Sequence, residues 1–202
     1  MNDPFHSELA GWSNFYLVTA SAAAALTGLQ FIVQTLMTPE SFRRFSGGDP
    51  ESGIAAFATP TVVHFSVAMM VSAILCAPWP GYAGLQATIG AIMAGALVYQ
   101  AIVFRRTRRQ KVYATTAYDW VWYVSFPAVA YAFILAAAVA GPFAAPWPPF
   151  LCAAGVLVLL GVGIHNSWDS VTYMTIVSLR SGRREEAAAA EAASEAASQD
   201  GE

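Results

Sequence analysis

The basic residues of this chain are confined to three short clusters, and each cluster follows a long apolar stretch. All ten lysine and arginine residues lie within residues 43–44, 105–111 and 180–184. A water-soluble domain distributes cations over its whole surface, and about 25% of its residues carry a charge. Here only 11% of the residues are charged and 56% are hydrophobic. This distribution is typical of an integral membrane protein, and it argues against a nucleic-acid-binding surface.

The stretches between the clusters are long enough to cross a bilayer as helices, which takes about 20 residues each. They are continuously apolar, whereas the strands of a membrane barrel alternate between apolar and polar residues. The sequence therefore predicts an all-α polytopic transmembrane bundle of five spans, at residues 12–37, 54–77, 82–104, 120–140 and 150–177. Residues 181–202 are rich in alanine and glutamate, and they predict a cytoplasmic tail that is partly disordered.

The charges of the connecting segments predict the orientation. The basic clusters follow the first, third and fifth spans, whereas residues 78–81 and 141–149 carry no charge. Segments rich in lysine and arginine stay on the cytoplasmic side of a membrane. We therefore expect the amino terminus outside and the carboxyl terminus inside.

Histidine and carboxylate side chains are few within the spans, namely His64, His165 and Asp169. Ionisable groups at membrane depth are costly and usually face the interior of the bundle. Cys76 and Cys152 lie at the outer ends of the second and fifth spans, 12 and 13 residues from the respective histidine. At 1.5 Å per residue, both histidines lie roughly 18–20 Å below the cysteines. If these two spans are neighbours, the histidines meet at one level.

This coincidence has three interpretations. In the first, the two histidines and Asp169 handle a proton or a small cation in the inner half of the bundle, because a carboxylate one helical turn away favours the charged imidazole. In the second, the histidines are axial ligands of a b-type haem. In the third, the polar groups only hold helices together, and each such bond contributes about 0.6 kcal/mol. Further candidate members of a site are Asn166, Asp119, Gln30, Gln34 and Tyr173.

Two further features concern contacts between helices. Cys76 and Cys152 could form a disulfide if their spans touch, or they could be free thiols within the bundle. Small residues four positions apart, Ala24 with Gly28 and Ala91 with Gly95, allow close helix packing within the chain or in a homodimer. The partners that we expect are therefore the lipid bilayer and, as an alternative, a second copy or another membrane protein.

The sequence contains no nucleotide-binding loop, nucleophile elbow or zinc-protease motif, so nothing in it favours an enzyme. Residues 12–36, which include AAAALTGL, and the segment HNSWDSVTY in the fifth span resemble a group of small, uncharacterised bacterial membrane proteins. The resemblance implies a multi-pass protein of the bacterial cytoplasmic membrane and carries no activity with it. The functions to be weighed are thus proton or cation handling, an accessory role with structural polar residues, and haem binding.

Overall fold

The computed structural model describes residues 4–36, 59–109, 116–140 and 147–199, and within these ranges all secondary structure is helical. Four of the helices are long: α1 (Pro4–Leu36), α4 (Thr59–Leu75), α5 (Tyr82–Arg109) and α8 (Trp147–Gln199). Between α5 and α8 the chain forms one helical segment of three parts, which are α6 (Ala117–Asp119), the π-helix η2 (Trp120–Ser125) and α7 (Phe126–Ala140). The prediction of an all-α fold is confirmed.

Four helical segments are long and apolar enough to cross a membrane, and they are Phe5–Thr35, Tyr82–Arg108, Ala117–Ala140 and Pro148–Thr172. They correspond to the first, third, fourth and fifth predicted spans. The second predicted span corresponds to α4, an apolar helix that is shorter than these four. Its first residues, 54–58, lie outside the described part of the chain.

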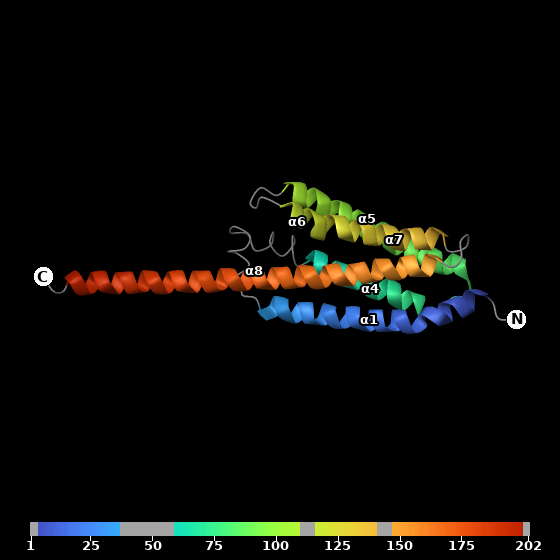
Figure 1. Cartoon of the computed structure of the whole chain (residues 1–202), viewed down its shortest axis with the longest axis horizontal. Coiled ribbons are helices and arrows are strands. Elements are labelled where there is room, and N and C mark those ends of the chain that lie inside the picture. Colours follow the sequence, from blue (N-terminus) through green and yellow to red (C-terminus); the bar gives the residue numbers. More distant parts are fainter. Residues whose placement is uncertain (1–3, 37–58, 110–115, 141–146, 200–202) are drawn as a thin grey trace.

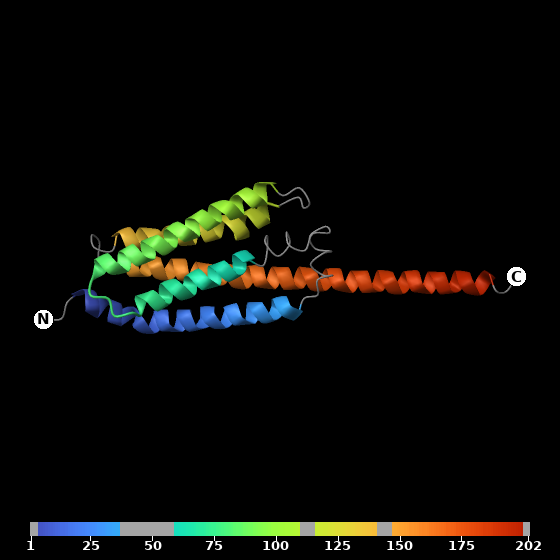
Figure 2. The ribbon, with the colours of Figure 1, turned by 180° about the vertical axis from the view of Figure 1, so that it is seen from behind.

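The helices form a bundle in which α8 has a central place. Successive helices run in opposite directions, so α1, α5 and α8 are parallel to one another and antiparallel to α4 and α7 (Figures 1 and 2). α8 packs against α4 and α7, while α1 packs against α4 and α5 packs against α7. The second and fifth predicted spans correspond to α4 and α8, which pack against each other. The condition on which a meeting of the two histidines depended is therefore fulfilled.

The two ends of the bundle differ in charge. α5 ends, and α8 leaves the bundle, at the end opposite to the one where α1 begins (Figure 1). We call this the arginine end, because the described cations there are Arg105, Arg106, Arg108, Arg180, Arg183 and Arg184. The opposite end, where α1 begins, is called the amino end. The first basic cluster and Lys111 lie outside the described residues.

α8 continues far beyond the bundle as a single helix of 53 residues (Figure 1). The sequence led us to expect a partly disordered tail over residues 181–202; in the structure α8 is helical as far as Gln199. The reason is local, because alanine and glutamate are among the strongest helix formers and the segment needs no apolar partner to favour this conformation.

Large apolar side chains cover the outside of the bundle as well as its core. Leu17, Val98, Val139 and Leu157, from four different helices, are each more than half exposed, with 51–66% of their surface accessible. A helix that is apolar on all sides is buried in a large protein or in a membrane. Since this bundle has few helices to bury them, the exposed apolar surface agrees with a lipid environment.

Two glycines of α8 allow neighbouring helices to approach closely. A Cβ atom at Gly163 would lie 2.3 Å from the ring of Phe65 in α4, and one at Gly155 would lie 2.8 Å from the carbonyl oxygen of Ala130 in α7. Both glycines therefore act in packing within the chain. By contrast, a Cβ at Gly28 or Gly95 would contact nothing within 4 Å, so these small residues do not serve packing among the described helices.

Candidate functional site

His64 is completely buried in the bundle and is bonded to a tyrosine of another helix. It lies on α4, and its Nδ1 is 2.7 Å from the hydroxyl oxygen of Tyr131 on α7. Both side chains have 0% of their surface exposed. The other ring nitrogen of His64, Nε2, is buried and has no hydrogen-bond partner among the described residues. A buried polar atom of this kind is rare in folded proteins, since it forfeits its bond to water without a replacement.

The contact between Phe65 and Gly163 sets the level of His64 along α8. Because α4 and α8 are antiparallel, the residue before Phe65 lies opposite the turn that follows Gly163. This turn contains Asn166, which lies three helical turns after Gly155 and therefore on the same side of α8 as that contact with α7. Asn166 thus faces the junction of α4, α7 and α8 at about the level of His64.

Asn166 is also completely buried and also has a nitrogen without a partner. Its surface is 0% exposed, and Nδ2 makes no hydrogen bond with a described residue. Its Oδ1 accepts a hydrogen bond from Nδ1 of the neighbouring His165, at 3.3 Å. Two buried nitrogens, one on α4 and one on α8, therefore lie near one level with an unused hydrogen-bonding position each.

His165 faces α6 and η2. Its Nε2 is 2.5 Å from the hydroxyl oxygen of Tyr118, and its ring stacks on Trp122 with a centroid separation of 3.5 Å and an interplanar angle of 4°. Because the amide oxygen of Asn166 can only accept, Nδ1 of His165 carries the hydrogen of that bond. In the neutral ring Nε2 is then the acceptor, and the Tyr118 hydroxyl donates to it.

The π-helix that carries Trp122 has an identifiable cause. Pro127 has no N–H group, so the carbonyl of Tyr123 loses the donor that an α-helix would supply four residues later. The buried Gln100 of α5 replaces it, since its Nε2 donates to the carbonyl oxygens of Tyr123 at 3.2 Å and Val124 at 3.0 Å. Widened turns of this type occur frequently at functional sites. Here the widened turn lies directly against His165.

The two acidic candidates have different roles. Asp119 forms a capping box with Thr116: its Oδ2 accepts from the Thr116 backbone N–H at 2.8 Å, and its own N–H donates to Thr116 Oγ1 at 3.3 Å. This carboxylate therefore serves the beginning of the fourth span. Asp169 is half-buried one turn after His165, and both ring nitrogens of that histidine are bonded to other residues.

The glutamine candidates lie on α1 and the tyrosine candidate lies on α8. Gln30 of α1 is buried, and its Oε1 accepts a hydrogen bond of 2.9 Å from Ser167, which connects α1 to α8 beside Asn166. Gln34 is half-buried one turn farther along α1. Tyr173 lies on α8, and its side chain is outside the described part of the structure.

The cysteines are free thiols, and the disulfide between them is not formed. Cys152 is buried, whereas Cys76 is exposed and its thiol donates to the carbonyl oxygen of Ser13 at 3.7 Å. Among the described residues no group of three histidine, cysteine or acidic side chains is close enough to bind one metal ion. A haem with two histidine ligands needs one nitrogen from each ring, and only His64 has a ring nitrogen without a described partner.

The structure also adds site residues that the sequence analysis did not select, namely Tyr131, Tyr118 and Trp122. Their signal in the sequence is weak, because tyrosine and tryptophan are common in membrane helices for other reasons. Pro127 was the better indication, since a proline within a predicted span requires local changes in hydrogen bonding.

Comparison with known proteins provides no family for this chain: no family model, no curated protein and no solved structure matches it.

Proposed function

We propose that this chain is a five-span protein of the bacterial cytoplasmic membrane, with its amino terminus outside, and that it takes up and releases protons at His64. The basic clusters of the sequence support the orientation. The four apolar helical segments and the antiparallel α4 between them support the five-span topology. The accessory and haem interpretations are alternatives with less support from the arrangement of the polar groups.

One observation carries the proposal: the buried Nε2 of His64 has no described partner, and the buried Nδ2 of Asn166 lies near the same level with none either. A water molecule bound at each atom would satisfy it, by donating a hydrogen bond to His64 Nε2 and accepting one from Asn166 Nδ2. Histidine is suited to this role because its unperturbed pKa lies near neutral pH, so that modest changes in surroundings change its charge.

Tyr131 can support His64 in both protonation states. A tyrosine hydroxyl both donates and accepts. When the ring is neutral and Nε2 is its acceptor nitrogen, Nδ1 carries the hydrogen and donates to the tyrosine oxygen; when Nε2 takes up a proton, this bond is kept. The imidazolium therefore keeps one hydrogen bond inside the bundle, which reduces the cost of charging it there.

Purely structural polar residues would be expected to satisfy one another. The interhelical bond between Thr19 of α1 and Ser72 of α4 is of that type, because both hydroxyls are buried and their oxygens are 2.9 Å apart. His64 and Asn166 are different, and on α5 Tyr99 Oη and Gln100 Oε1 are also buried without a described partner. Buried polar atoms without a described partner therefore lie on α4, α5 and α8. Such atoms favour the binding of water or protons over a role that is limited to holding the helices together.

The test is proton flux into vesicles that contain the purified full-length chain and a trapped pH-sensitive dye. We expect His64→Gln to reduce the flux at least about tenfold, because the amide can still bond to Tyr131 but does not exchange a proton near neutral pH. Tyr131→Phe should also reduce it, by less. Ser72→Ala is the matched control, since it removes a buried bond on the same helix outside the proposed site.

Flux in His64→Gln equal to that of the unsubstituted protein would overturn the proposal. So would an equal loss in Ser72→Ala, because a general loosening of α4 would then explain both results. Circular dichroism of each variant shows whether the helices are retained.

A further inference from the structure

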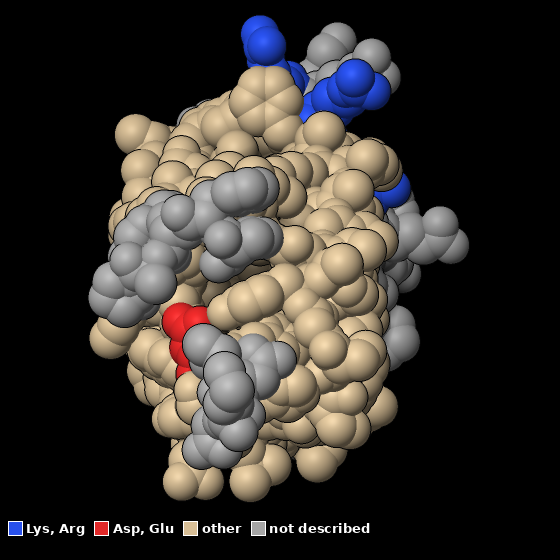
Figure 3. Space-filling model, turned by 90° about the vertical axis from the view of Figure 1, so that its right-hand side faces the viewer, with Lys and Arg blue, Asp and Glu red and all other residues tan. Residues whose placement is uncertain are grey.

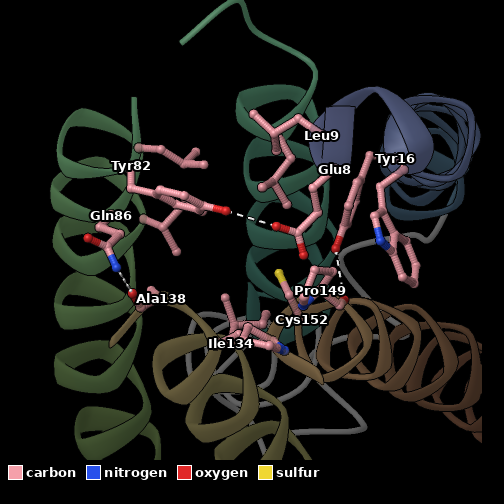
Figure 4. A pocket seen from close by; sticks show the side chains of 15 residues that line it. Glu8, Leu9, Tyr16, Tyr82, Gln86, Ile134, Ala138, Pro149 and Cys152 are labelled. Atoms are coloured by element: carbon pink, nitrogen blue, oxygen red, sulfur yellow. Dashed lines mark hydrogen bonds between the residues drawn. The ribbon is translucent and has the colours of Figure 1, made fainter. Parts of the chain in front are cut away.

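A cavity opens at the amino end of the bundle, and its wall is formed by residues of α1, α4, α5, α7 and α8. It contains about 80 Å³ of free space and is bounded mainly by apolar side chains. The residues that line it are Glu8, Leu9, Trp12 and Tyr16 of α1, Leu75 of α4, Tyr82, Leu85, Gln86 and Ile89 of α5, Ile134, Ala137 and Ala138 of α7, and Pro148, Pro149 and Cys152 of α8. Its position is shown in Figure 4. Concave apolar sites with a few polar groups are typical of small-molecule binding.

The polar side chains in this wall are hydrogen-bonded to other groups of the protein. The Tyr82 hydroxyl donates to Glu8 Oε2 at 2.8 Å, the Tyr16 hydroxyl donates to the Pro149 carbonyl at 3.2 Å, and Gln86 Nε2 donates to the Ala138 carbonyl (Figure 4). A carboxylate accepts about four hydrogen bonds. Glu8 therefore retains acceptor capacity on the cavity side, and a ligand that donates is the better match.

The charge of Glu8 has no basic partner in the cavity. Its lining residues include neither lysine nor arginine nor histidine, and the described arginines belong to the arginine end of the bundle. Figure 3 views the molecule from the amino end, where acidic atoms emerge at one place and the visible cations lie toward the margin. The cavity thus presents a negative charge that an incoming cation would neutralise.

Aromatic rings complete this environment. Trp12, Tyr16 and Tyr82 line the cavity together with the carboxylate. The faces of such rings attract ammonium groups, and this attraction increases when the cation is removed from water. We infer that this cavity binds an alkylammonium ion, whose ammonium group is held by Glu8 and the aromatic rings and whose apolar chain enters the space between α5, α7 and α8.

The volume of the cavity and its apolar wall further restrict the ligands that fit. About 80 Å³ holds a short alkyl chain and not a whole phospholipid. The ammonium of a phosphatidylethanolamine head group is followed by a phosphate, for which the apolar wall offers no partner. A free amine with a hydrocarbon chain is the better match. Neither His64 nor Tyr131 is among the lining residues, so the site is separate from the proposed proton site.

The test uses hexylammonium, with hexanol as its neutral analogue, and measures binding to the full chain in phosphatidylglycerol nanodiscs by saturation-transfer NMR. We expect hexylammonium to bind more tightly than hexanol. Glu8→Gln should weaken hexylammonium about tenfold and leave hexanol unchanged, which corresponds to the loss of one charge-assisted hydrogen bond. Glu186→Gln, an equal change of charge on the exposed part of α8, is the matched control and should change neither.

Ala138→Leu should weaken both ligands, because it fills the cavity. Equal affinity for hexanol and hexylammonium, or an unchanged affinity in Glu8→Gln, would overturn the inference. Loss of hexylammonium binding when phosphatidylethanolamine replaces phosphatidylglycerol in the nanodiscs would also overturn it, because the occupant would then be a lipid head group.

Discussion

The polar regions around His64 and around Glu8 differ in what they lack. Around His64 the helices are closely packed, yet buried nitrogens of His64 and Asn166 have no described partner. Around Glu8 the polar groups are bonded to one another, yet the helices leave free space between them. The first region lacks a small hydrogen-bonding species and has little room, which suits water or a proton. The second has unfilled space and lacks a positive charge, which suits an organic cation.

Helix packing explains the difference. Gly163 brings α4 against α8 beside His64, so the polar side chains there are enclosed. At the amino end the rings of Trp12, Tyr16 and Tyr82 line a cavity between the helices. The following predictions test this contrast by changing one region and its counterpart in parallel.

The largest effect is expected at the close contact of α4 and α8. Gly163→Leu should lower the free energy of unfolding by about 3 kcal/mol, because the new side chain would overlap the buried ring of Phe65. Gly161→Leu is the control, since nothing lies within 4 Å of a Cβ there, and it should change the free energy by less than about 0.5 kcal/mol. Titration with sodium dodecyl sulfate in mixed micelles provides the measurement.

Combining Gly163→Leu with Phe65→Ala should recover part of the lost stability, because the alanine substitution removes the ring that the leucine side chain would overlap. Equal destabilisation by leucine at residues 161 and 163 would show that the close approach does not hold the polar region together.

An intermediate effect is expected for two glutamines of α5 that both serve α7. Gln100→Leu should cost about 2 kcal/mol, because two buried carbonyls lose their donor. Gln86→Leu should lower the free energy of unfolding by about 1 kcal/mol, since the carbonyl of Ala138, near the last residue of α7, loses its donor. Thermal unfolding of both variants in the same detergent compares the two regions directly.

Pro127→Ala supplies the missing N–H group and should make the Gln100→Leu change less harmful. If Gln86→Leu proves as costly as Gln100→Leu, the interior of the fourth span does not depend on α5 more strongly than its end does.

The smallest effect separates helix capping from proton handling. Asp119→Ala should lower stability by about 1 kcal/mol through loss of the capping box. It should leave proton flux in vesicles unchanged, because the carboxylate is bonded to Thr116. A loss of flux as large as that expected for His64→Gln would place Asp119 in the proton path and redefine the polar region.

Part of this arrangement follows from local properties of the chain. Continuous apolar stretches predicted helices, and the structure has helices at each of the five positions as far as they are described. The helical rise also predicted comparable depths for His64 and His165, and Phe65 opposite Gly163 places α4 and α8 accordingly. The tail was harder to predict, because its composition is compatible both with disorder and with an extended single helix.

What the sequence by itself determined is the set of helices, the confinement of the basic residues to three clusters, and the position of each polar residue along its helix, since these depend on neighbouring residues along one chain. The partners of the polar groups depend on how each helix is rotated and which helices are adjacent, and close packing decides both. Only the tertiary structure therefore paired His64 with Tyr131, turned His165 toward Tyr118 and Trp122, and left a cavity beside Glu8.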